Sequence, residues 1–169
     1  MNTQELRSKQ APIKEKYKID PDSAVITLKA KGKPGNGITC KLETGKALAE
    51  AGLHPATGGD GLSLCSGDML LESLVACAGV TLMAVATAME INIKDSEVIA
   101  EGDLDFKGTL GVSKDVPVGF KNIRLIFIID SDAPKDKIDK LIQLTERYCV
   151  VYQTLVKPPE IQVNHELRV

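Results

Sequence analysis

Residues 68–90 read DMLLESLVACAGVTLMAVATAME. This stretch is apolar on nearly every face of a helix, and a helix of that kind is usually enclosed by other elements. Ser66 or Asp68 is expected to cap its start. Glu72 and other polar residues interrupt it, so no apolar run reaches the ~20 residues of a membrane span. The sequence therefore predicts one long helix buried inside a soluble protein.

Shorter elements are predicted on both sides of this helix. Alternating apolar residues and β-forming residues predict five strands, at residues 24–30, 38–44, 96–110, 121–130 and 160–169. Helical patterns cover the remaining regular segments, at residues 3–16, 132–149 and 151–156. Residues 31–37 (KGKPGNG) predict a turn between the first two strands, and Asp132 and Pro134 mark a helix start.

This order of elements is typical of an α+β fold with antiparallel strands. The chain has 169 residues, which corresponds to about one domain. We expect a single domain over residues 1–169, with residues 1–20 as an N-terminal extension.

Composition excludes several classes of function. The net charge is −2, and only four of the 21 basic residues are arginine, whereas nucleic-acid surfaces need clustered basic residues. The N-terminal residues contain no apolar segment of the kind that a secretory signal requires. We therefore expect a cytoplasmic protein that binds neither nucleic acid nor membranes, with its four cysteines reduced.

Two of the cysteines stand where they could be reactive. Cys77 has small neighbours in LVACAGVTL, which allow a ligand or another backbone to approach closely. Cys149 stands between two predicted helices in ERYCVVYQTL, and a helix N-terminus favours a thiolate. Taken singly, each cysteine is also consistent with a small buried packing residue.

Together, the two motifs resemble the OsmC/Ohr family of thiol peroxidases. The resemblance rests on GDMLLESLVACAGVTL and RYCVVYQTL, with Cys77 and Cys149 separated by 72 residues. The second motif keeps the Cys and the Thr-Leu of the family pattern and departs from its Pro and Ser. The resemblance is clear over residues 66–157, and it implies an OsmC-like fold that forms an intertwined homodimer.

The resemblance also implies a function. Cys77 would attack an organic hydroperoxide and become a sulfenic acid, and Cys149 would then close a disulfide. The implied partners are the hydroperoxide and a dithiol reductant of the lipoyl or thioredoxin type, and no cofactor is implied. The alternatives are an OsmC-like protein that binds an apolar ligand, or a redox sensor, in either case without efficient peroxidase turnover.

The family's remaining site residues map less directly. The family places an arginine in an early strand, and the predicted early strands here contain none, so Arg7 is the candidate. Lys29, Lys31 or Lys41 would supply charge without the planar guanidinium, and Arg7 could equally be a solvated surface charge.

The family also has a carboxylate near the start of the long helix, and Asp68 matches that position best. Nine helical residues place Asp68 half a turn from Cys77 and ~13 Å along the axis. It could therefore orient a partner group without touching Cys77. Glu72 is the other candidate.

Residues 53–67 form a Gly-rich loop with two further residues to consider. Cys40, His54 and Cys65 lack the close pairing of structural zinc ligands, so no metal site is expected. Cys65 is either a third redox thiol or a packing residue.

Overall fold

The computed structural model describes residues 2–19, 31–34, 39–43 and 48–167. Its helices are α1 (Thr3–Ile19), α2 (Ser66–Ala88), α3 (Phe106–Thr109), α4 (Lys135–Tyr148) and α5 (Val150–Val156), with a 3-10 turn at Pro55–Thr57. Its strands are β1 (Lys31–Pro34), β2 (Thr39–Glu43), β3 (Leu48–Gly52), β4 (Leu64–Cys65), β5 (Asp95–Asp103) and β6 (Asn122–Asp130). The mixture of helices and sheets agrees with the predicted α+β class.

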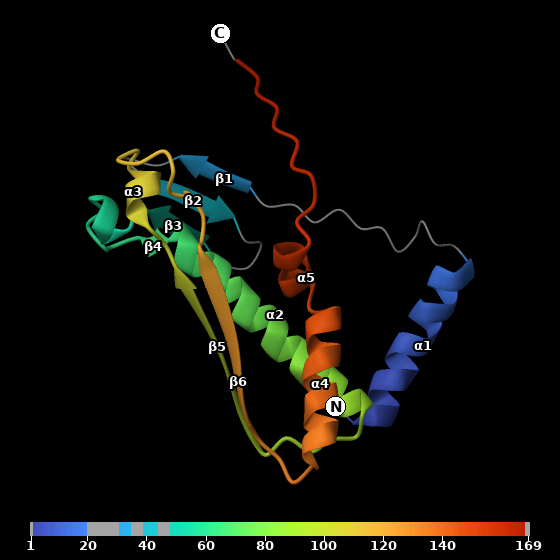
Figure 1. The fold of residues 1–169 in the computed structure, drawn as a ribbon. Coiled ribbons are helices and arrows are strands. Elements are labelled where there is room, and N and C mark those ends of the chain that lie inside the picture. Colours follow the sequence, from blue (N-terminus) through green and yellow to red (C-terminus); the bar gives the residue numbers. More distant parts are fainter. Residues whose placement is uncertain (1, 20–30, 35–38, 44–47, 168–169) are drawn as a thin grey trace.

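The helix predicted at residues 68–90 is α2, which runs through the middle of the molecule (Figure 1). The N-cap residue of α2 is Cys65, and its side chain makes no capping hydrogen bond. The capping role expected of Ser66 or Asp68 is therefore wrong, because both residues already lie inside the first turn. By length and composition α2 could cross a membrane, a test that core helices of soluble proteins also pass.

One stripe of α2 is buried and another is exposed. Leu74, Ala78, Leu82 and Ala86 are buried, and their spacing of four residues places them on one face. On the other side, Val80 is 74% exposed. Within one chain, the expectation of a helix enclosed on nearly every face therefore holds for one face only.

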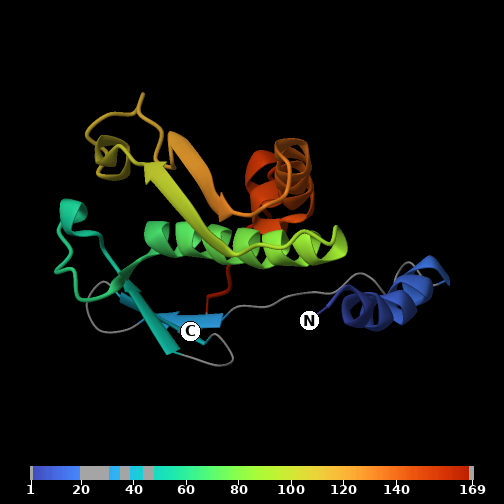
Figure 2. The same ribbon diagram turned by 90° about the horizontal axis from the view of Figure 1, so that it is seen from below.

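The β5–β6 hairpin covers the buried stripe of α2. The two strands are antiparallel, and Val98 pairs with Phe127 and Ala100 with Leu125. Alternate residues of β6 are half-buried, as expected for a strand with one face on the core. Helices α4 and α5 pack against α2 beside this hairpin, and β1–β4 lie on the opposite side near the helix start (Figure 2).

The small sheet has the order β1-β2-β3-β4. The predicted hairpin is present, but its first strand is β1, whose Lys31 pairs with Glu43 of β2. The prediction of a turn that starts at residue 31 is thus wrong for residues 31–34, and the predicted strand at 24–30 lies outside the described residues. Strands β3 and β4 were not predicted, and they pair in parallel, so the sheets are not wholly antiparallel.

Three further boundaries differ from the prediction. The strand predicted at 96–110 ends at Asp103, because Asp105 accepts the Lys107 N–H and starts α3. Helix α4 starts after Pro134. The carboxylate of Asp132 forms an ion pair with Lys94 and does not cap the helix. Residues 160–167 form no strand, because no strand of the described part of the chain pairs with them.

Candidate thiol site

The local geometry of the chain brings Cys77 and Cys149 together. Cys77 lies in the middle of α2, and Cys149 is the single extended residue between α4 and α5, with φ −72° and ψ 110°. The Cys149 N–H donates to the Thr145 carbonyl at 2.9 Å and its carbonyl accepts from the Gln153 N–H at 2.9 Å. These two bonds fix the position at which the chain turns from α4 into α5.

The two thiols lie close enough for each to shift the pKa of the other, and neither forms a disulfide. Cys149 is buried with Leu74 and Ala78, and Cys77 packs half-buried against this cluster. The pairing predicted from the two sequence motifs is therefore present as a contact within one chain.

Opposing effects act on the pKa of Cys77. Burial raises the pKa of this thiol, but the Val151 N–H, the Cys149 thiol, the Val150 N–H and the Thr81 hydroxyl all lower it. The lowering effects prevail, so the pKa of Cys77 lies below the ordinary value. Hydrogen bonds from amides to a thiolate favour the charged form. Cys77 is accordingly the thiol of the pair that ionises more readily.

Cys149 behaves in the opposite way. Burial raises its pKa, as does the neighbouring Cys77, while the Tyr152 and Val151 amides offset part of this effect. The sequence suggested that the start of α5 would favour a Cys149 thiolate. The structure shows that this expectation is wrong, because burial outweighs these amides at Cys149.

Arg7 lies away from the two thiols. Its guanidinium is 3.9 Å from the carboxylate of Glu90, beyond the end of α2 and about 20 Å along the helix axis from Cys77. The groups that lower the pKa of Cys77 are two amides, a thiol and a hydroxyl, and none of them is a cation. Lys29 lies outside the described residues, as do the side chains of Lys31 and Lys41.

Asp68 also remains separate from the thiols within one chain. It lies in the first turn of α2 and lines a cavity of about 350 Å³ together with His54 and Cys65. Glu72 lies one turn further along and lines a separate surface hollow with Asp68. The sequence-based placement of Asp68 at the start of the helix is thus confirmed, while its role in catalysis stays a prediction.

His54 and Cys65 both line this cavity. The interactions of His54 hold the local loop in place. The His54 Nδ1 accepts the Ala56 N–H at 3.0 Å, and its ring stacks on Phe106 at 5.0 Å. Within the part of the chain that the structure describes, no three His, Cys, Asp or Glu side chains are grouped as metal ligands would be. The side chain of Cys40 lies outside that part.

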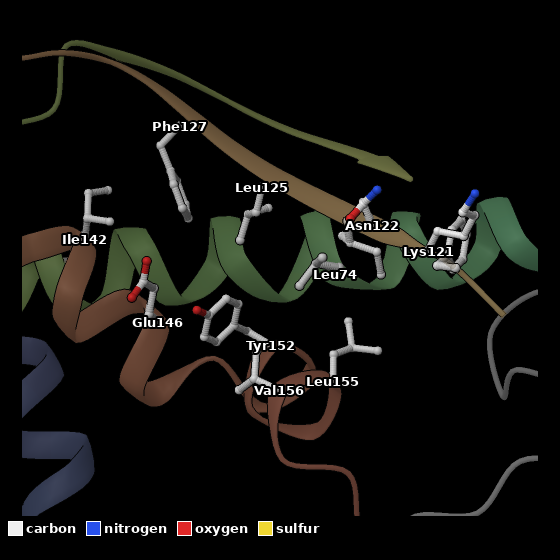
Figure 3. A pocket seen from close by; sticks show the side chains of 12 residues that line it. Leu74, Lys121, Asn122, Leu125, Phe127, Ile142, Glu146, Tyr152, Leu155 and Val156 are labelled. Carbon is white, nitrogen blue, oxygen red and sulfur yellow. The ribbon is translucent and has the colours of Figure 1, made fainter. Parts of the chain in front are cut away.

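A second cavity, of about 480 Å³, lies between β6 and the helices α4 and α5 (Figure 3). Its walls are mainly apolar, and Tyr152, Leu155 and Leu74 belong both to this wall and to the cluster around Cys149. Glu146 and the hydroxyl of Tyr152 lie near each other at its edge. The sequence did not indicate this cavity, because residues from four separate elements form it.

The fold and the sequence match a known protein family. A sequence model described as OsmC-like protein matches residues 58–164. The chain belongs to the OsmC-like family. The matched range contains α2, the β5–β6 hairpin and both thiols, and the family resemblance seen in the two cysteine motifs is thereby confirmed.

Solved structures of OsmC-like proteins have a similar fold. An OsmC-like protein from Mycoplasma pneumoniae is 17% identical with a TM-score of 0.66, over 79% of this chain and 89% of that one. An organic hydroperoxide resistance protein from Legionella pneumophila is 18% identical with a TM-score of 0.62, over 79% and 91%. The corresponding Bacillus subtilis protein is 18% identical with a TM-score of 0.54, over 79% and 93%. No curated protein sequence matches the chain.

Proposed function

We propose that this OsmC-like protein is a thiol peroxidase that reduces organic hydroperoxides. The observation that carries the proposal is the contact between Cys77, whose pKa is lowered, and Cys149, whose pKa is raised. A nucleophile must ionise, whereas the partner thiol must stay protonated until a sulfenic acid has formed. The names of the solved relatives from Legionella pneumophila and Bacillus subtilis support the same substrate class.

The proposed reaction has three balanced steps. The Cys77 thiolate attacks the terminal oxygen of ROOH, the O–O bond breaks, and RO⁻ leaves and takes up a proton to become ROH. The Cys149 sulfur then attacks the Cys77 sulfenic acid, so that a disulfide forms and water leaves. A dithiol reductant of the lipoyl or thioredoxin type exchanges with this disulfide, returning both thiols and becoming a disulfide itself.

The proposed active form is a cytoplasmic homodimer. An exposed apolar stripe on α2 includes Val80 and Met83, which are 74% and 47% exposed. The C-terminal residues 160–167 keep a strand-like alternation, and Ile161 and Val163 are more than 80% exposed. Exposed apolar surface of this kind marks an interaction site, and we assign a second copy of the chain as its partner.

The dimer also bears on Arg7 and Asp68. Neither residue reaches Cys77 within one chain, so their proposed catalytic roles require the second subunit or a movement of α1. The second candidate function is an apolar-ligand-binding or redox-sensing protein without efficient turnover. It is favoured by the described residues, since the groups among them that lower the pKa of Cys77 are amides, a thiol and a hydroxyl.

The test is a titration of the reduced protein with cumene hydroperoxide, with product mapping by mass spectrometry. We expect one equivalent to give a Cys77–Cys149 disulfide, and Cys149→Ser to accumulate Cys77 sulfenic acid. Cys65→Ser is the matched control, because Cys65 is also free and half-buried but does not contact the pair. Continuous consumption with a dithiol would establish the enzyme. Thiols that stay reduced at modest excess would overturn the proposal and favour ligand binding.

A further inference from the structure

Thr81 stands one helical turn after Cys77 on α2. Its hydroxyl donates to the Cys77 carbonyl at 2.7 Å and is half-buried. Side chains four residues apart lie one above the other on a helix, and they tilt toward its N-terminus. The Thr81 hydroxyl is therefore held beside the residue that carries the reactive sulfur.

The hydrogen bond to the carbonyl is common and does not by itself indicate a function. Thr87, Thr145 and Thr154 make the same bond to the carbonyl four residues before them. At those three positions the residue four before is Met83, Leu141 or Val150, none of which can ionise. Thr81 differs because the residue one turn before it is a cysteine.

The hydroxyl can leave the carbonyl without leaving an unsatisfied group. The Cys77 carbonyl also faces the backbone N–H of Thr81, its regular partner in an α-helix. A hydroxyl has one proton to donate and two lone pairs, and it rotates freely. It can thus accept from the Cys77 S–H in the neutral state and donate to the sulfur in the ionised state.

The other donors to Cys77 are less adaptable. The Val150 and Val151 N–H groups are fixed by the backbone at the start of α5, and the Cys149 thiol is consumed when the disulfide forms. The hydroxyl that donates to the Cys77 carbonyl is also among the groups that lower the pKa of Cys77, so it lies close enough to turn toward the sulfur. It is the one rotatable donor in this set that the reaction does not use up.

We propose that Thr81 is a positioning residue whose hydroxyl turns from the carbonyl to the sulfur of Cys77 when the thiol ionises. This inference deepens the proposed function and rests on Cys77 being its nucleophile. The hydroxyl would hold the thiolate in one rotamer, and it would remain as a partner for the sulfenic acid after the first step.

Among the described residues, the titratable groups that pack with the cluster around Cys77 come from the α4–α5 junction. The α4–α5 junction contributes the Cys149 thiol and the Tyr152 phenol, and β5 and β6 contribute apolar side chains to the cluster. The strand residues concerned are Val98, Ala100, Ile123, Leu125 and Phe127. Since the two thiols titrate as a pair, the pH profile is best compared in a Cys149→Ser background.

The experiment measures the rate of Cys77 alkylation by iodoacetamide against pH, followed by mass spectrometry of the Cys77 peptide. Thr81→Val removes the donor at nearly constant volume, and we expect the profile to move up by about half to one pH unit. Alkylation at pH 7 then slows roughly three- to tenfold. Thr81→Ser should restore the original profile.

Thr87→Val is the matched control, because it deletes the same kind of bond from the same helix away from the thiols. Cys65 in each protein serves as an internal reference. An unchanged Cys77 profile in Thr81→Val overturns the inference, and so does an equal shift in Thr87→Val. If Thr81→Val fails to fold, Thr81→Ala carries the same test. The readout needs no peroxide, so it separates this inference from the proposed function.

Discussion

The thiol pair shows how position alone gives two identical side chains opposite chemical properties. Cys77 projects from the middle of a helix toward the start of another, and two amides of that second helix lower its pKa. Cys149 is part of the turn between helices and is almost completely buried, so desolvation dominates. A thiol that ionises more readily beside one that ionises less readily is the division of roles that the proposed two-cysteine mechanism requires.

A second residue-scale feature is Gly102 on β5, where a side chain would collide with an aromatic ring. A Cβ built there would lie 2.4 Å from a Phe120 ring carbon. We expect Gly102→Ala to lower the free energy of unfolding by about 1–3 kcal/mol, because the ring must leave its place. Urea denaturation followed by circular dichroism measures this loss.

Gly119 provides the control for this substitution, since a Cβ there meets nothing within 4 Å. Gly119→Ala should change the stability by much less. Combining Gly102→Ala with Phe120→Leu should be less destabilising than the sum of the two changes. Equal losses for Gly102→Ala and Gly119→Ala would contradict the packing explanation.

At the scale of elements, the C-terminal end of α2 has a strained backbone conformation that a glycine would relieve. Glu90 has φ 58°, a left-handed conformation that glycine adopts without penalty. The Ile91 N–H donates to the Ala86 carbonyl at 2.9 Å, which is the closing bond of a Schellman-type helix end. Glu90→Gly should therefore stabilise the protein by about 1 kcal/mol, which raises Tm by ~2–4 °C.

Glu90→Ala separates the backbone effect from the loss of charge. Both variants remove the exposed contact with Arg7, but alanine keeps the Cβ that the left-handed conformation disfavours. Calorimetry should show a rise in Tm for glycine and no rise for alanine. Identical transitions for the two variants would show that the conformation at residue 90 stores no strain.

The elements also show which parts of the fold were predictable. Helix α2 and strand β6 were predicted within two residues, because long periodic patterns are strong local signals. Strand β3 was missed since LAEAG has neither β-branched nor aromatic residues. Its conformation depends on pairing with β2 and β4, and this pairing cannot be predicted from the local sequence. The Cys149 environment was missed for the same reason, because contacts across elements determine it.

At the scale of the whole molecule, two features of the chain lack the contacts that the sequence leads us to expect. The strand predicted at residues 160–169 matches the sequence pattern but forms no strand in its described part. The helix expected to be fully enclosed is exposed along the stripe that contains Val80. Both predictions follow the local hydrophobic pattern, and neither structure is complete within one chain. This result is expected if a second chain supplies the missing contacts.

The homodimer can be tested with two valines of nearly equal exposure. Val80 on α2 is 74% exposed, and Val112, in the loop between α3 and β6, is 72% exposed. If the α2 stripe packs against a second copy, Val80→Glu buries an unpaired charge and should dissociate the dimer. Val112→Glu should leave it intact. Light scattering after size-exclusion chromatography reports the mass of each, and circular dichroism confirms that both are folded. A monomeric wild type, or a Val80→Glu variant that remains dimeric, would show that this stripe does not form the interface.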